Sequence, residues 1–95
     1  MMYFITTIQE KNDEIVDQRC VGYVDTYENA EEIVKNNEYD ICETIYNYAV
    51  IEAIPSGIYQ YDTNEKWFHY NEIKDTYEKC DKPEFAKHMV GFGIG

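Results

Sequence analysis

Two stretches of this chain, residues 2–9 and 46–54, consist mainly of aromatic, β-branched and other apolar side chains. Such side chains pack well on a pleated surface, so both stretches predict β-strands. In the first stretch these residues fall on both alternating faces, which is typical of a strand inside a sheet. The second stretch is the strongest strand pattern of the chain and predicts the central strand. The fold must therefore contain a sheet.

One main helix is predicted between these strands, over residues 26–36. Asp25, with Glu28 three residues later, is a variant of the capping box that opens helices. A narrow apolar stripe follows, which predicts that one face of the helix is buried. The pair Asn36-Asn37 tolerates the left-handed conformation and should end the helix.

The remaining segments predict a mainly antiparallel sheet. Residues 10–18 are mostly polar and predict a hairpin loop after the first strand. Further short elements are expected as strands over 19–24, 58–61, 66–70 and 75–80, a helical turn through 39–45 and a short helix over 83–88. The chain is therefore predicted to be a single α+β domain over residues 1–95, an antiparallel-rich sheet of about four to six strands with one main helix packed on one face.

Acidic residues dominate the charge of the chain. Nineteen Asp and Glu stand against eight Lys and Arg, and twelve of the acids but only three of the bases lie in residues 1–54. Such a domain repels phosphate backbones and anionic lipid, so we expect no direct nucleic-acid binding and no membrane binding. A partner protein with a basic surface is the partner that this charge favours.

The acids are densest around the predicted helix. One interpretation is a solvated helix face; the other is a surface that docks on a basic cleft of another protein, such as the cleft of a nucleic-acid-binding protein. The candidate acidic face consists of Asp25, Glu28, Glu31, Glu32 and Glu38.

An alternative candidate site combines the single arginine with aromatic side chains. A guanidinium can grip a phosphate while aromatic rings stack on a base, so this set predicts a module that sequesters a small nucleotide-like ligand. The competing interpretations are an ion pair between Arg19 and a nearby carboxylate, and plain cross-strand packing of the rings. Alternation along a strand over 66–70 also predicts that one aromatic set packs under the helix while the other stays partly exposed. The candidate residues are Arg19, Tyr46, Tyr48, Tyr59, Trp67 and Tyr70.

Catalytic and metal-binding patterns are weak. The three cysteines are widely spaced and form no C-x-x-C pair, so they predict reduced thiols rather than a disulfide framework or a zinc site. Neither His69 nor His88 stands in a local signature with a cysteine. We therefore expect a non-catalytic protein without metal or cofactor. The N-terminal segment lacks the pattern of a signal peptide, which predicts a cytoplasmic protein, and the sequence leaves homo-oligomerisation open.

Several short runs together resemble a family of short uncharacterised acidic proteins from Gram-positive bacteria and their phages and mobile elements. The resemblance implies an accessory protein that inhibits a host defence protein, and it implies no activity, cofactor or site residue. The runs are Met2-Tyr3-Phe4-Ile5-Thr6-Thr7, Arg19-x-Val21-Gly22-Tyr23, Asp40-Ile41-x-Glu43, Tyr46-Asn47-Tyr48-Ala49-Val50-Ile51-Glu52, Gly57-Ile58-Tyr59, Trp67-Phe68 and Gly91-Phe92-Gly93-Ile94-Gly95.

Overall fold

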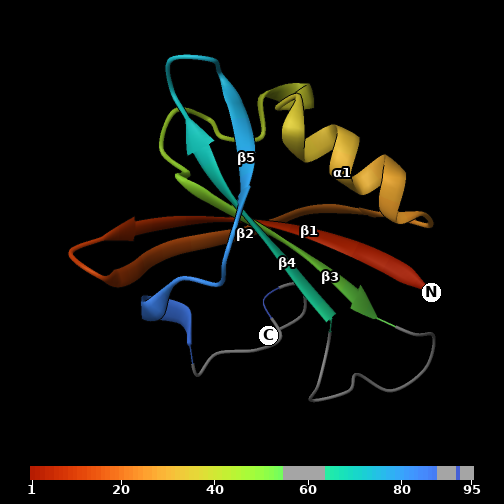
Figure 1. The fold of residues 1–95 in the computed structure, drawn as a ribbon, viewed down its shortest axis with the longest axis horizontal. Coiled ribbons are helices and arrows are strands. Elements are labelled where there is room, and N and C mark those ends of the chain that lie inside the picture. The colour runs from red at the N-terminus through yellow and green to blue at the C-terminus, as the bar shows by residue number, and fades with distance from the viewer. Residues whose placement is uncertain (55–63, 88–91, 93–95) are drawn as a thin grey trace.

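A computed structural model describes residues 1–54, 64–87 and 92 of the chain. It contains a five-stranded antiparallel sheet with the order β2-β1-β3-β4-β5 and one α-helix, as shown in Figure 1. The elements are β1 (Met2–Lys11), β2 (Glu14–Val24), α1 (Tyr27–Lys35), a 3₁₀ turn η1 (Glu38–Asp40), β3 (Tyr48–Ile54), β4 (Asn64–Asn71), β5 (Thr76–Cys80) and a second 3₁₀ turn η2 (Glu84–Ala86). The predicted small α+β fold is confirmed.

The strand order confirms two further predictions. β3 is the central strand, and β1 is an interior strand between β2 and β3. In the described chain β2 and β5 are the two edges of the sheet. The expected strands over 66–70 and 75–80 correspond to β4 and β5, whereas the expected strand over 58–61 lies outside the described residues.

The predicted hairpin is present and β2 pairs back on β1, but the loop predicted over 10–18 is too long. β1 continues to Lys11 and β2 begins at Glu14, so the turn is only Asn12-Asp13. Both turn residues have positive φ, 55° and 65°, which suits a tight hairpin and which Asn and Asp tolerate. Residues 14–18 of the predicted loop belong instead to β2, an edge strand that is mostly exposed, and residues 10 and 11 belong to β1.

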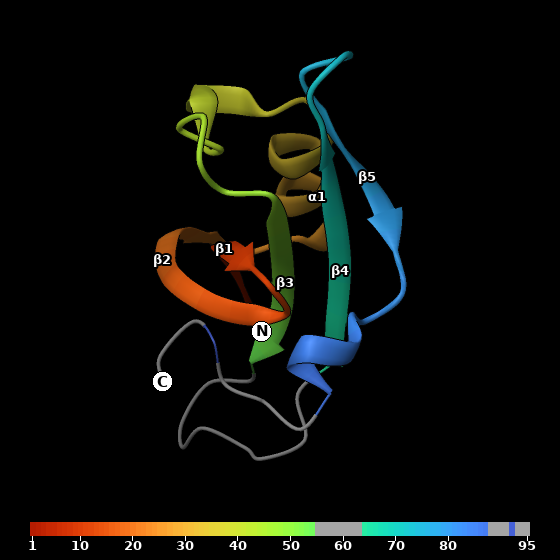
Figure 2. The same cartoon turned by 90° about the vertical axis from the view of Figure 1, so that its left-hand side faces the viewer.

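The N-cap of α1 lies one residue later than the predicted capping residue, and the helix begins at Tyr27. Thr26, not Asp25, is the N-cap, and its side chain accepts a hydrogen bond of 3.3 Å from the backbone N–H of Asn29. The end of the helix is confirmed, because Asn36 is its C-cap and Asn37 adopts the left-handed conformation with φ 47°. The helix packs on one face of the sheet (Figure 2).

Apolar clusters cover both faces of the sheet. The helix-side cluster contains Ile5, Ala30, Val34, Ile41, Cys42, Ala49, Ile51, Phe68 and Tyr77. The far-side cluster contains Ile8, Val50, Trp67, Ala86 and Phe92. Ala86 and Phe92, which follow β5 in the chain, thus cover the second face of the sheet. The backbone N–H of Phe92 also donates a 3.1 Å hydrogen bond to the buried carboxylate of Glu52.

This cover changes the prediction that one aromatic set of β4 stays partly exposed, because His69 is exposed but Trp67 on the same face is buried. Phe68 and Tyr70 do lie on the helix side and Trp67 on the other, as alternation predicts. Trp67 is only 3% exposed, because Phe85, Ala86 and Phe92 pack against it.

The connection between α1 and β3 is only partly helical. The helical turn expected through 39–45 is limited to η1, and left-handed residues interrupt the rest. Tyr39, Asp40, Glu43 and Thr44 all have positive φ between 45° and 63°. The short helix expected over 83–88 is the 3₁₀ turn η2, and His88 lies outside the described residues.

Candidate functional site

Four of the five candidate carboxylates lie on the surface and have no counter-charge among the residues that the structure describes. Glu28 and Glu32 are one helical turn apart and both exposed, Asp25 precedes the cap and is exposed, and Glu38 follows the helix and is half-buried. Within the part of the chain that the structure describes, no ion pair involves any of these four. We call Asp25, Glu28, Glu32 and Glu38 the acidic face.

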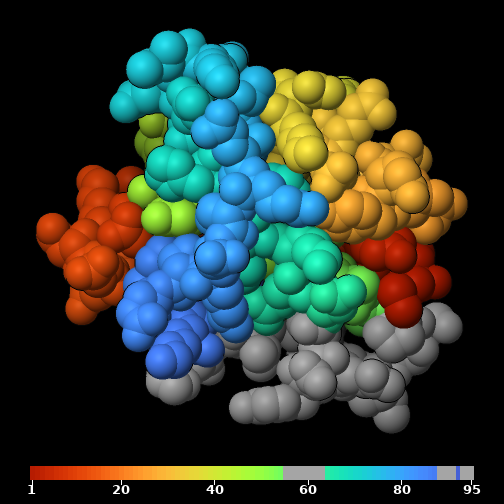
Figure 3. Space-filling view, viewed as in Figure 1, coloured from red at the N-terminus to blue at the C-terminus, as the bar shows by residue number. Residues whose placement is uncertain are grey.

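Glu31 has a different role from the other four. Its carboxylate accepts a 2.8 Å hydrogen bond from the Tyr27 hydroxyl and lies 3.6 Å from the ammonium groups of Lys35 and of Lys79 on β5. The hydrogen bond from Tyr27 and the two lysines hold the pKa of Glu31 below its usual value. Burial, helped by the same hydrogen bond, raises the pKa of Tyr27 to about 12. Glu31 therefore fastens the helix to β5, beside which the helix lies in Figure 3, and it is not a free docking carboxylate.

Most of the basic side chains form ion pairs with acids outside the acidic face. Six of the eight Lys and Arg side chains are paired with acids elsewhere in the chain. These pairs are Arg19–Glu43, Lys35–Glu31, Lys74–Glu78, Lys79–Glu31, Lys82–Glu65 and Lys87–Glu84. The negative field around α1 therefore extends into solvent, where it can act on a cationic partner.

A shallow hollow of about 230 Å³ opens beside the acidic face. Its lining combines apolar and acidic side chains from the end of β2, the outer side of α1 and η1. The lining residues are Val24, Asn29, Glu32, Ile33, Glu38 and Tyr39. Sequence reasoning missed Tyr39, which is 87% exposed and has the left-handed φ of 62°.

Side-chain hydrogen bonds hold the loop that carries Tyr39. The Asn37 amide donates to Asp75 in the β4–β5 turn at 3.0 Å, and its carbonyl oxygen accepts from the Cys42 N–H at 3.1 Å. Farther along, the hydroxyl of the buried Tyr77 donates to the Tyr46 carbonyl at 3.1 Å. The loop is therefore fixed to the sheet on both sides of Tyr39 and Asp40.

The structure distributes the alternative aromatic and arginine set over both faces of the sheet. Arg19 forms an ion pair with Glu43, as one competing interpretation expected. It pairs across the strands with Thr7, which in turn pairs with Ala49 of the helix-side cluster, so Arg19 belongs to the helix side. Tyr48 and Trp67 lie on the far side, with ring centroids 6.4 Å apart. The sheet therefore separates the guanidinium from these two rings.

The other tyrosines of this set take part in internal contacts. The Tyr46 hydroxyl donates to Asp17 at 2.9 Å, and that hydrogen bond raises the pKa of Tyr46. The Tyr70 hydroxyl donates to Asp75, and its ring packs against Tyr77. Tyr59 lies outside the described residues. Among the described residues these side chains do not form a single clamp.

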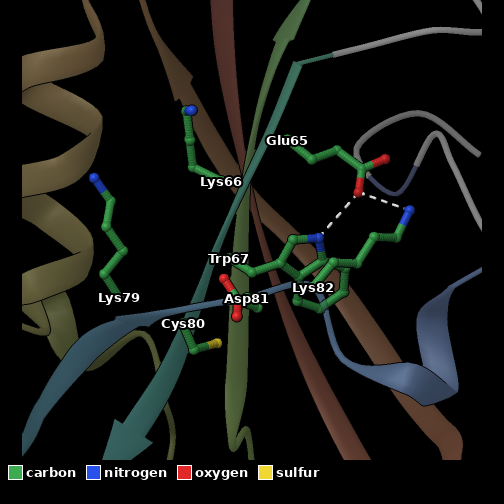
Figure 4. Close-up of a pocket in the computed structure, with 7 residues that line it drawn as sticks. All are labelled: Glu65, Lys66, Trp67, Lys79, Cys80, Asp81 and Lys82. Carbon is green, nitrogen blue, oxygen red and sulfur yellow. Dashed lines mark hydrogen bonds and ion pairs between the residues drawn. The ribbon is translucent and has the colours of Figure 1, made fainter.

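A depression of about 530 Å³ lies beside β4, the end of β5 and the two residues that follow β5 (Figure 4). The Glu65 carboxylate accepts a 2.9 Å hydrogen bond from Trp67 Nε1 and forms a 3.0 Å ion pair with Lys82, as the dashed lines show. Lys66 and Lys79 point to the side of the helix, away from that pair. The Trp67 indole N–H and the Lys82 ammonium group thus both interact with the Glu65 carboxylate.

A histidine and a cysteine do share a depression, but they do not form an activated pair. His69 and Cys80 both line an open hollow of about 400 Å³ beside Tyr48, and no hydrogen bond between them is present in the structure. Burial, with Asp81 nearby, raises the pKa of the Cys80 thiol. A nucleophilic cysteine needs a lowered pKa, so this environment disfavours Cys-His catalysis. In residues 1–54, 64–87 and 92, no group of three or more His, Cys, Asp or Glu is placed to hold a metal ion.

Comparisons with models of known protein families, with curated proteins and with solved structures found no match. The described part of the chain also contains no helix that is long and apolar enough to cross a membrane.

Proposed function

We propose that this protein is a non-catalytic binding protein that docks its acidic face on a basic surface of another protein. The observation that carries the proposal is that Asp25, Glu28, Glu32 and Glu38 have no cationic partner among the described residues, although most Lys and Arg side chains are paired elsewhere. A surface that served only for solubility would not need its acids to be separated from the basic side chains. A cationic partner surface, in contrast, is attracted more strongly by acids that are not already paired.

The resemblance to accessory proteins of phages and mobile elements suggests a class of partner. A host defence protein that binds nucleic acid offers a cleft lined with Lys and Arg, because such clefts neutralise phosphates. Carboxylates spaced along a helix can occupy this cleft and compete with the nucleic acid. In this form of the proposal the protein is an inhibitor.

The alternative function, sequestration of a nucleotide-like ligand, has less support. It requires Arg19 and at least two aromatic rings around one pocket, and Arg19 lies on the opposite side of the sheet from Tyr48 and Trp67. Its arginine is also already paired with Glu43.

Affinity capture with charge-reversed baits tests the proposal. The test bait carries E28K and E32K, and the control bait carries E14K and E84K, which make the same change in net charge at two exposed sites outside the acidic face. The proposal predicts that proteins captured from a host lysate by the wild type are lost with the test bait and retained with the control bait. Equal capture by both variant baits would contradict it.

A further inference from the structure

The hollow beside the acidic face has the composition of a slot for one long cationic side chain. We propose that it receives an arginine side chain of the partner protein, which would make Tyr39, Glu32 and Glu38 its recognition residues. This inference rests on the proposed function, because it names the group on the partner that the acidic face binds.

The lining of the hollow matches the two parts of an arginine side chain. Val24 and Ile33 are half-buried and provide an apolar wall for the methylene stem. Glu32 of α1 and Glu38 of η1 both line the hollow, so two acidic residues border the same space. A volume of about 230 Å³ accommodates a single side chain and is too small for a folded segment.

Tyr39 is the feature that favours arginine over other cations. Tyr39 lines the hollow and is 87% exposed, so its side chain is accessible to a ligand. A planar guanidinium stacks on an aromatic face and is more weakly hydrated than an ammonium group. Two carboxylates beside it then supply acceptors for the forked donors of the guanidinium.

The slot is built in advance of binding. Tyr39 holds a left-handed backbone that a bulky residue adopts only where the surroundings enforce it. Asn37 supplies that enforcement through its hydrogen bonds to Asp75 and to the Cys42 N–H. A loop backbone that is fixed before association loses little conformational freedom on binding, which improves affinity.

The test is a titration of the full-length ¹⁵N-labelled protein with N-acetyl-arginine N-methylamide, followed by NMR. The matched control ligand is the citrulline counterpart, which has nearly the same shape without the charge. We expect the arginine compound to shift the amide signals of Val24, Ile33, Glu38 and Tyr39 and to give ring contacts with Tyr39, while the citrulline compound does neither. The variants Y39A and E32Q should each weaken arginine binding about threefold or more, and E14Q should leave it unchanged.

Three results would overturn the slot: equal shifts with both compounds, shifts that map elsewhere, or unchanged binding by Y39A and E32Q. The experiment can contradict arginine binding in the slot without contradicting docking through the acidic face. Y39A keeps every carboxylate, so a Y39A bait that captures the partner as well as the wild type, while E28K/E32K does not, rejects the slot and retains the acidic face. Loss of capture by both baits, with retention by E14K/E84K, supports both.

Discussion

Asn37 Nδ2 lies 3.0 Å from Asp75 Oδ1, so the residue that follows the C-cap of α1 is fastened directly to the turn between β4 and β5. The two residues are 38 positions apart in the chain. The same Asp75 carboxylate oxygen accepts from the Tyr70 hydroxyl. This small network fixes the loop that presents Tyr39 to solvent, and it makes the candidate site depend on the stability of the sheet.

Replacing Asn37 by alanine should therefore destabilise the fold. Asn37 is 7% exposed, and its removal leaves the Cys42 N–H without its acceptor and Asp75 without one donor. We expect a loss of about 2–3 kcal/mol in the free energy of unfolding, measured by urea denaturation. The matched control N36A, at the exposed neighbouring position, should change the free energy by less than about 0.5 kcal/mol. Equal effects of both changes would contradict this role of Asn37.

Glu31 and Glu28 should respond differently to charge reversal. E31K removes the acceptor of the Tyr27 hydroxyl and places a third cation beside Lys35 and Lys79. It should cost about 1–2 kcal/mol in thermal or urea unfolding, whereas E28K should be nearly neutral for stability. If E28K destabilised the protein as much as E31K, the assignment of Glu31 to the internal network would be wrong.

Trp67 should act as a core residue and not as a binding anchor. W67A removes a ring that is 3% exposed and packed edge-to-face on Phe85 and Phe92, so it should cost about 3–5 kcal/mol in the free energy of unfolding. W67F should cost less, because it keeps most of the packing and loses the hydrogen bond to Glu65. Trp67 is the only tryptophan, so its emission should be blue-shifted in the folded protein and move to the red on unfolding. A solvent-exposed emission spectrum in the folded state would contradict this burial.

Stability should fall at alkaline pH. The pKa of Tyr27 is raised from 10.0 to about 12, mainly by burial, and the pKa values of Tyr46 and Tyr77 are also raised. A group whose pKa is higher in the folded state contributes stability that is complete below its unfolded pKa and is lost as pH rises through the folded value. We therefore expect the free energy of unfolding to decline as pH rises from 10 toward 12. The ultraviolet absorbance of tyrosinate should show a late group of tyrosines that ionise together with loss of helix. Titration of all tyrosines near pH 10 with the fold intact would contradict this account.

The sequence was sufficient for elements whose signal is local. The interior strand β1, the central strand β3 and the end of α1 at Asn36-Asn37 follow from apolar patterning and from residues that tolerate left-handed backbone. The extension of β2 was missed because an edge strand faces solvent along most of its length and its composition resembles that of a loop.

Contacts between distant segments could not be predicted. Ala86 and Phe92 bury Trp67, and Lys79 on β5 forms an ion pair with Glu31. The residues next to Trp67 and Glu31 in the sequence do not indicate these partners. Tyr39 was missed for a related reason. The residues around a tyrosine in the sequence do not distinguish an exposed side chain from a buried one. Only the structure of the loop shows that Tyr39 faces solvent.

The most direct test of the central claim is the salt dependence of the association rate between this protein and a captured partner. Charges on two surfaces are largely screened beyond about 8 Å at physiological ionic strength, so steering by the acidic face should weaken as salt is added. We expect the association rate to fall steeply with ionic strength for the wild type and for E14K/E84K. For E28K/E32K it should be slower at low salt and nearly independent of salt, while the dissociation rate changes much less in all three. An association rate that is indifferent to salt and equal in wild type and E28K/E32K would contradict docking through the acidic face.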